Sequence, residues 1–195
     1  MSDALKIENF PEIIIIRFNR PEIRSPLSIA VLEELHRIVD EIKTDVNIKT
    51  VIFTGAKDVF ASGADLREIA QVTKETARAF ASRGQNLMRK ISELPQTTIA
   101  AINGYCFGGA LDLALACKKR IASPNALFSH PGVNLGIITG WGGTQRLPRL
   151  VGEAKALEIF LTGKRVDAEE ALRMGLIDEI ARDPLAKCLE RISHS

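Results

Sequence analysis

The chain has 195 residues, of which 46% are hydrophobic and 26% charged, so it can bury one core of ordinary size. A net charge of +2 and an aromatic content of 5% favour neither a nucleic-acid-binding surface nor attachment to an acidic membrane. The three cysteines show no C-x-x-C spacing, and the N-terminus carries no apolar signal region. We therefore expect buried thiols, without disulfides or a metal site, in a cytoplasmic protein.

Strand-like and helix-like hydrophobic patterns alternate along the chain. The patterns predict strands at 13–18, 50–54, 97–102 and 176–180, and short strands at 120–122 and 126–128. They predict helices at 29–42, 66–70, 76–94, 110–117, 142–150, 153–161 and 167–173, the last with Asp167 as its N-cap. This alternation favours an α/β fold with largely parallel strands.

Two glycine-rich stretches stand where a strand pattern gives way to a helical one: 60–66 (FASGADL) and 103–112 (NGYCFGGALD). A helix start presents unpaired N–H groups and the positive end of the helix dipole. Two such starts aimed at one oxygen would form an oxyanion hole, which stabilises charge that develops in a transition state. An ordinary strand-to-helix turn, with Asp65 as the helix cap, also explains the first stretch.

Asp112 lies one turn beyond Gly109 in a helix that is otherwise apolar. A buried carboxylate needs a partner. It is either a first-turn acid paired with free N–H groups or an acid/base beside the oxyanion site. A third glycine cluster at 140–146 either binds an anion or allows close packing, and nearby His130 is either a structural histidine or part of a cleft. G-x-S-x-G, a Walker lysine and metal-ligand spacing are all absent from the sequence.

Taken together, these motifs resemble those of the crotonase superfamily, the enoyl-CoA hydratase/isomerase family. The matching segments are 18–22, 60–66, 102–113, 128–131, 140–149, 161–163 and 171–178. The resemblance implies a spiral core of repeated ββα units over 1–182, followed by a short helical tail over 183–195 in place of the family's longer C-terminal helical region. It also implies a homo-oligomer, either a trimer or a hexamer.

The resemblance further implies an acyl-CoA thioester substrate. Coenzyme A then arrives as part of the substrate, and no permanently bound cofactor is expected. By the match, the N–H groups of Ala64 and Gly109 bind the thioester carbonyl oxygen and hold the enolate, while Asp112 acts as the acid/base.

The same match implies positions for the coenzyme A portion of the substrate. The Ser62 carbonyl and the backbone of Asp65 and Leu66 would lie along the adenine end. Arg24 sits in a loop where the family often has a basic residue near the phosphates.

Two positions depart from the hydratase pattern, which has glutamates where this chain has Asp112 and Gly132. Three hypotheses follow. The chain is a lyase or isomerase that uses Asp112, a non-catalytic acyl-CoA-binding protein, or an enzyme for another enolate reaction such as decarboxylation or thioester hydrolysis. In the last two hypotheses the motifs still serve to bind the thioester. His130 is a candidate to replace the missing carboxylate.

Overall fold

The computed structural model describes residues 3–193. Its strands are β1 (Leu5–Phe10), β2 (Ile13–Phe18), β3 (Thr50–Thr54), β4 (Val59–Ala61), β5 (Thr97–Ile102), β6 (Tyr105–Phe107), β7 (Lys119–Ala122), β8 (Leu127–Ser129), β9 (Val166–Asp167) and β10 (Glu179–Ile180). Its helices are α1 (Ile29–Thr44), α2 (Leu66–Ile69), α3 (Ala77–Ser92), α4 (Gly109–Ala116), α5 (Gly143–Val151), α6 (Glu153–Thr162), α7 (Ala168–Arg173) and α8 (Pro184–Ser193), with 3-10 turns η1 (Pro21–Ile23) and η2 (Pro131–Leu135).

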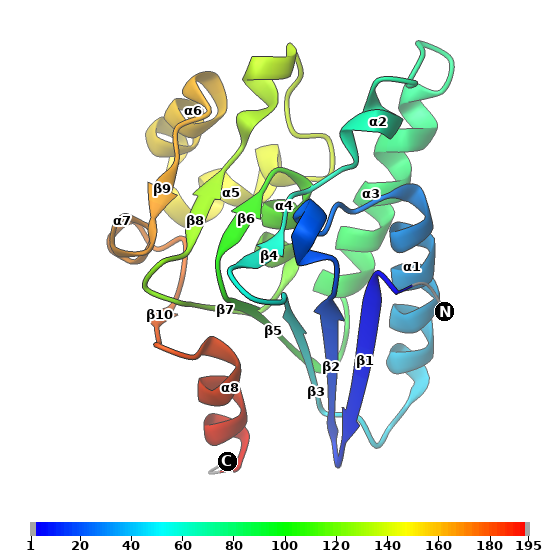
Figure 1. Ribbon diagram of the computed structural model, residues 1–195, viewed down its shortest axis with the longest axis vertical. Helices are drawn as coiled ribbons and strands as arrows, with labels where there is room; N and C mark the ends of the chain where they lie inside the picture. Colours follow the sequence, from blue (N-terminus) through cyan, green and yellow to red (C-terminus); the bar gives the residue numbers. More distant parts are fainter. Residues whose placement is uncertain (1–2, 194–195) are drawn as a thin grey trace.

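The strands form two sheets. The first has the order β1-β2-β3-β5-β7-β10, and all of its pairs are parallel except β1 with β2. The second has the order β4-β6-β8-β9, with only β8 and β9 antiparallel. Each of the pairs β3/β4, β5/β6 and β7/β8 places one strand in each sheet before the chain enters a helix (Figure 1). The expected repeated ββα architecture is confirmed.

The β-branched run in β2 is explained by burial on both faces of the first sheet. Ile14 and Ile16 point into the main core with α1, α3 and α4, whereas Ile13 and Ile15 belong to a second apolar cluster that contacts α8. A strand buried on both faces reads as a continuous apolar run, because neither side meets water. Figure 1 shows α1 and α3 together on one side of the strands, whereas α8 packs on the other face of the first sheet, against β3, β5 and β7.

The predicted strand at 176–180 is wrong over most of its length. Only Glu179–Ile180 pairs, with β7. The N–H of Leu176 instead donates to the carbonyl of Ala171 at 2.8 Å, and Gly175 has φ +79°, so the chain is still closing the end of α7. The sequence interpretation also missed β1, β4, β6 and β9.

The three cysteines, Cys106, Cys117 and Cys188, are buried free thiols, as expected. Asp167 caps α7 by accepting a hydrogen bond from the N–H of Glu170 at 2.7 Å, which confirms that prediction. Among residues 3–193, no helix combines the length and the apolar character that a membrane span requires. In the predicted tail, 183–193 is described and largely forms α8, while His194 and Ser195 lie outside the described residues.

Candidate active site

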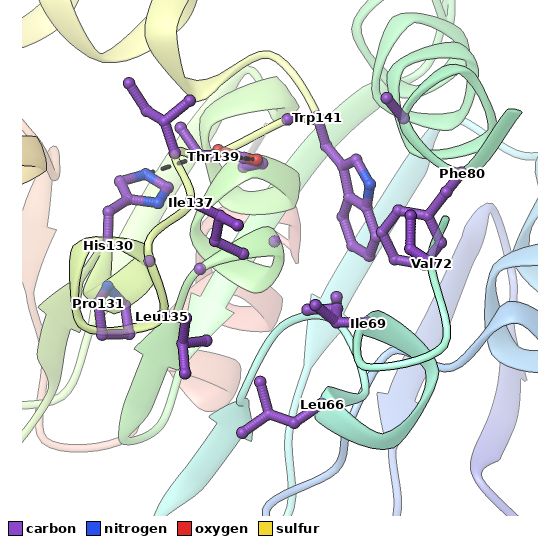
Figure 2. A pocket seen from close by; sticks show the side chains of 18 of the residues that line it. Leu66, Ile69, Val72, Phe80, His130, Pro131, Leu135, Ile137, Thr139 and Trp141 are labelled. Atoms are coloured by element: carbon purple, nitrogen blue, oxygen red, sulfur yellow. Dashed lines mark hydrogen bonds and ion pairs between the residues drawn. The ribbon is translucent and has the colours of Figure 1, made fainter. Parts of the chain in front are cut away.

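A cavity of about 360 Å³ opens where the two glycine-rich stretches meet the loop that follows β8. Its apolar walls come from α2, α3 and the 130–141 loop, and Figure 2 shows Phe80 and Trp141 on the side opposite His130. Ser62, Ala64, Gly109 and Asp112 all line it. The cavity therefore gathers most of the residues that the sequence singled out.

Gly63 brings the two glycine-rich stretches into direct backbone contact. A Cβ at this position would lie 2.7 Å from the nitrogen of Gly109 and 2.7 Å from the carbonyl oxygen of Phe107. Gly63 also has φ +86°, a conformation that side-chain-bearing residues rarely adopt. Both features require glycine, and together they place Ala64 beside the start of α4.

The N–H groups of Ala64 and Gly109 donate to no acceptor within residues 3–193. The Gly109 N–H is free because it belongs to the first residue of α4 and has no carbonyl one turn earlier to receive it. Neighbouring backbone bonds fix both segments: Leu27 N–H donates to Gly63 O at 2.7 Å, and Gly108 N–H donates to Ser129 O at 2.9 Å. The cavity wall thus carries two N–H groups that are fixed in position and have no acceptor among the described residues.

Asp112 is fully buried on α4, whose other side chains pack into the core. Its Oδ2 accepts a hydrogen bond from the Thr139 hydroxyl, and no N–H group of α4 donates to it. Pairing with its own helix start therefore does not describe this carboxylate. Burial raises the pKa of Asp112 to about 7, although the Thr139 hydroxyl and the Trp141 N–H lower it. A carboxyl with such a pKa exchanges protons near neutrality.

His130 follows β8 and lies next to Asp112, with Nε2 3.5 Å from Oδ1. The side chain is only 3% exposed, and neither ring nitrogen makes a hydrogen bond to the described residues. Burial lowers the pKa of His130 to about 4, so the ring is neutral at pH 7. Of the two sequence interpretations, the one that placed His130 in a cleft is confirmed (Figure 2).

The third glycine cluster allows close packing. Trp141 lies between Gly84 and Gly109, where a Cβ on either glycine would come within 2.2 Å of the indole. Phe80 contacts the same ring, with centroids 6.0 Å apart. A Cβ at Gly143 would lie 2.2 Å from Asp112 Oδ1. The cluster therefore lets the Trp141 indole pack against the start of α4. It also lets the backbone at Gly143 approach the Asp112 carboxylate closely.

Only some of the residues assigned to coenzyme A line the cavity. Ser62 and Leu66 line the cavity, whereas Asp65 and Arg24 do not. The Asp65 side chain caps α2 by accepting from the N–H of Arg67, as the alternative explanation of that stretch predicted. Arg24 is exposed, and its loop lies beside the first stretch, since Ser62 N–H donates to Ser25 O at 3.5 Å.

A family model described as enoyl-CoA hydratase/isomerase matches residues 8–191. The chain belongs to the enoyl-CoA hydratase/isomerase family. It is 41% identical over 181 residues to a Bacillus subtilis (strain 168) protein named probable enoyl-CoA hydratase, covering 92% of this chain and 69% of that protein. It is 38% identical over 175 residues to the short-chain-enoyl-CoA hydratase of Clostridium acetobutylicum, covering 89% and 67%.

A crystal structure of enoyl-CoA hydratase from Bacillus anthracis has the same fold, with a TM-score of 0.92 and 38% identity. The match covers 98% of this chain and 76% of that one. The chain therefore spans about two thirds to three quarters of the length of these members of the family. The resemblance inferred from the motifs is confirmed, as is the expectation of an enzyme of the hydratase/isomerase type.

Sequence reasoning missed Thr139, which together with Gly143 of the third glycine cluster completes the surroundings of Asp112 in this member of the family. Thr139 is 27 residues from its partner, and no local pattern marks a hydroxyl that meets a distant carboxylate. Gly132 is more constrained than the sequence suggests, because a Cβ there would lie 2.8 Å from the carbonyl oxygen of Ile137. That loop has no room for a larger side chain without moving its backbone.

Proposed function

We propose that the protein hydrates or isomerises an enoyl-CoA through an enolate intermediate. The N–H groups of Ala64 and Gly109 bind the thioester oxygen, and Asp112 moves a proton at the α-carbon. The observation that carries this proposal is the buried Asp112 carboxyl, with a pKa raised by burial to about 7, in the cavity wall that carries two unused backbone donors. Such donors stabilise an enolate oxygen more strongly than a ground-state carbonyl.

The cavity walls support an acyl chain as the group bound inside. Its lining includes the aliphatic or aromatic side chains of Leu66, Ile69, Val72, Phe80, Leu135, Ile137, Ile138 and Trp141. The coenzyme A portion would pass Ser62 and the backbone of Asp65 and Leu66 toward Arg24, where a guanidinium pairs well with phosphate. Coenzyme A belongs to the substrate in this proposal, and the active form is a homo-oligomer, a trimer or a hexamer.

A second candidate is an acyl-CoA-binding protein without turnover. The observation in its favour is Gly132, which supplies no side chain where the hydratase pattern has a glutamate. Binding needs only the cavity and the donors, whereas hydration needs groups that also manage water and its protons.

The deciding experiment is incubation of the protein with a panel of enoyl- and acyl-CoA thioesters in heavy water, followed by mass spectrometry. A gain in mass equal to one water reports hydration, and deuterium uptake without other change reports enolisation. We expect one or both from the unaltered protein and neither from Asp112→Asn. Tight binding of several thioesters with no mass change in any of them would establish the second candidate instead.

A further inference from the structure

Three buried nitrogen and oxygen atoms without partners gather at one wall of the cavity. They are Oδ1 of Asp112 and both ring nitrogens of His130, and none makes a hydrogen bond to the described residues. Buried polar atoms nearly always have a hydrogen-bond partner, since burying one alone costs free energy. Three of them within one pair of side chains indicate a place built to bind a small polar group.

Oδ1 and Nε2 face each other in the cavity wall, and both atoms are almost completely buried. Thr139 occupies the other carboxylate oxygen, Oδ2, so Oδ1 is left as the free acceptor. At Gly143 a Cβ would lie 2.2 Å from Oδ1 and 3.1 Å from Nε2, so any larger residue would clash with the carboxylate and press tightly against the imidazole. Glycine at this helix start therefore preserves the approach of Asp112 to His130.

The position of His130 is equally fixed. It follows β8, whose Ser129 pairs with Phe107 of β6, and it precedes Pro131 at the start of η2. The imidazole packs against the Phe160 ring, with centroids 5.3 Å apart. The phenylalanine side chain has no nitrogen or oxygen atom that could pair with the imidazole nitrogens. In this position, Nε2 of His130 faces Asp112.

We propose that His130 is the second proton-transfer group of this site, and that its Nε2 and Asp112 Oδ1 together hold the water that attacks the enoyl thioester. This inference rests on the proposed hydration. His130 accepts a proton from the water as the water oxygen bonds to the β-carbon, and the displaced electron pair forms the enolate held by Ala64 and Gly109.

The protons balance over one turnover. The Asp112 carboxylic acid donates its proton to the α-carbon of the enolate, which regenerates the thioester carbonyl. The His130 imidazolium then returns its proton to the Asp112 carboxylate across the 3.5 Å gap. One water has been added, and both side chains are again neutral.

Burial sets the protonation states in which the pair starts. It lowers the pKa of His130 to about 4, so the ring is neutral before the reaction but a weaker base than a free imidazole, and it raises the pKa of Asp112 to about 7, so a large share of the carboxyls is protonated at pH 7. The His130 imidazolium is therefore the stronger acid of the two and gives its proton back to the Asp112 carboxylate. Arg146 also acts on Asp112 and favours the carboxylate. The nearby Cys106 thiol stays neutral, because burial, with a smaller effect of Asp112, raises its pKa.

The test separates hydration from enolisation with two probes. Hydration is followed with but-2-enoyl-CoA in ¹⁸O-labelled water, and enolisation by exchange of the α-hydrogens of butanoyl-CoA in heavy water. We expect His130→Asn to lower hydration by at least about a hundredfold, the usual effect of removing an acid/base group, with exchange within about threefold of the unaltered protein. Asp112→Asn should lower both reactions.

The matched control is His36→Asn. His36 lies on α1, away from the cavity, where Nε2 contacts Arg83 O at 3.1 Å. Both reactions should be unchanged in this variant. Unaltered hydration in His130→Asn, or equal loss of hydration and exchange in a variant with the normal melting temperature, would overturn the inference. Absence of both reactions in the unaltered protein would instead reject the proposed function.

A second measurement needs no substitution at His130. Nitrogen NMR of the histidine rings should show Nε2 of His130 shift on addition of 3-hydroxybutanoyl-CoA, whose hydroxyl takes the place of the water. Butanoyl-CoA, which lacks that hydroxyl, should leave the signal in place. The same shift with both ligands, or with neither, would contradict the placement of the water.

Discussion

The buried carboxyl of Asp112 should affect both the rate of turnover and the stability of the folded protein. At the residue scale, we expect Asp112→Asn to lower turnover of the true substrate by at least about a hundredfold, because an amide cannot exchange the proton that the carboxyl transfers. The rate is measured under saturating thioester with each variant checked for its melting temperature. Thr139→Val, which removes the hydroxyl that holds Oδ2, should lower turnover less. Unchanged turnover in Asp112→Asn would remove the carboxyl from the mechanism.

The same residue predicts a pH dependence of stability. Burial raises the pKa of Asp112 from 3.8 in its ordinary state to about 7, so the folded protein binds more protons than the unfolded chain between these values. The contribution of Asp112 to stability therefore falls as the pH rises through 7. We expect the melting temperature of Asp112→Asn, relative to the unaltered protein, to increase from pH 5 to pH 8.

Asp65 provides the control for that experiment. The Arg67 guanidinium holds the pKa of Asp65 below its ordinary value, so this carboxylate stays ionised from pH 5 to pH 8 in the folded protein. The difference between Asp65→Asn and the unaltered protein should stay constant over this range. A pH trend for Asp65→Asn that matched that for Asp112→Asn would show that the effect does not come from burial of Asp112.

At the scale of elements, the turn before α2 and the start of α4 depend on each other. We expect Gly63→Ala to destabilise the protein by about 1–3 kcal/mol through its positive φ alone, and by more through contact with Gly109 and Phe107. Activity should fall sharply, because the two donors would move apart. Chemical denaturation and turnover measure the two effects.

Gly152 offers a matched comparison for this substitution. Its φ of +84° is close to the +86° of Gly63, but a Cβ there would meet nothing within 4 Å. Gly152→Ala should therefore lose stability and keep activity. Equal activity in the two variants would mean that the contact between the glycine-rich stretches has no part in catalysis.

Sequence reasoning worked for elements that carry their own pattern. The long helices and the buried strands at Ile13–Phe18, Thr50–Thr54 and Thr97–Ile102 were predicted because their burial imposes a regular hydrophobic period. The second sheet was largely missed, since β4 and β6 have three residues each and are stabilised by pairing with strands that are distant in the sequence. The same limit applies to the site. Asp112 stands out in the sequence because its helix is otherwise apolar, whereas the role of Thr139 depends on its hydrogen bond to Asp112, which only the fold brings about.

At the scale of the whole molecule, both faces of the first sheet are covered, and we expect the stability of the protein to depend on both covers. Helix α8 packs over a cluster that contains Ile13, Ile15, Ile52, Ile99 and Ile121, and it buries Cys188 there. We expect deletion of residues 183–195 to lower the melting temperature by at least about 5 °C, since about 2–4 °C is lost per kcal/mol in a chain of this size. The exposed apolar face should also promote self-association, measured by light scattering.

A surface change on the same helix gives the comparison. Lys187 forms an exposed ion pair with Glu190 at 2.9 Å, an interaction that contributes little to stability. Lys187→Ala should leave the melting temperature within about 2 °C of the unaltered protein. If the deletion were equally mild, the cover provided by α8 would not be needed for folding.

The closed turn around Gly132 also restricts which side chains this position can carry. Because a Cβ at Gly132 would approach the Ile137 carbonyl oxygen to 2.8 Å, one codon change to glutamate distorts the loop before its carboxylate reaches the cavity. Gly132→Glu alone should therefore not place a second carboxylate in the cavity unless the backbone near Ile137 moves with it.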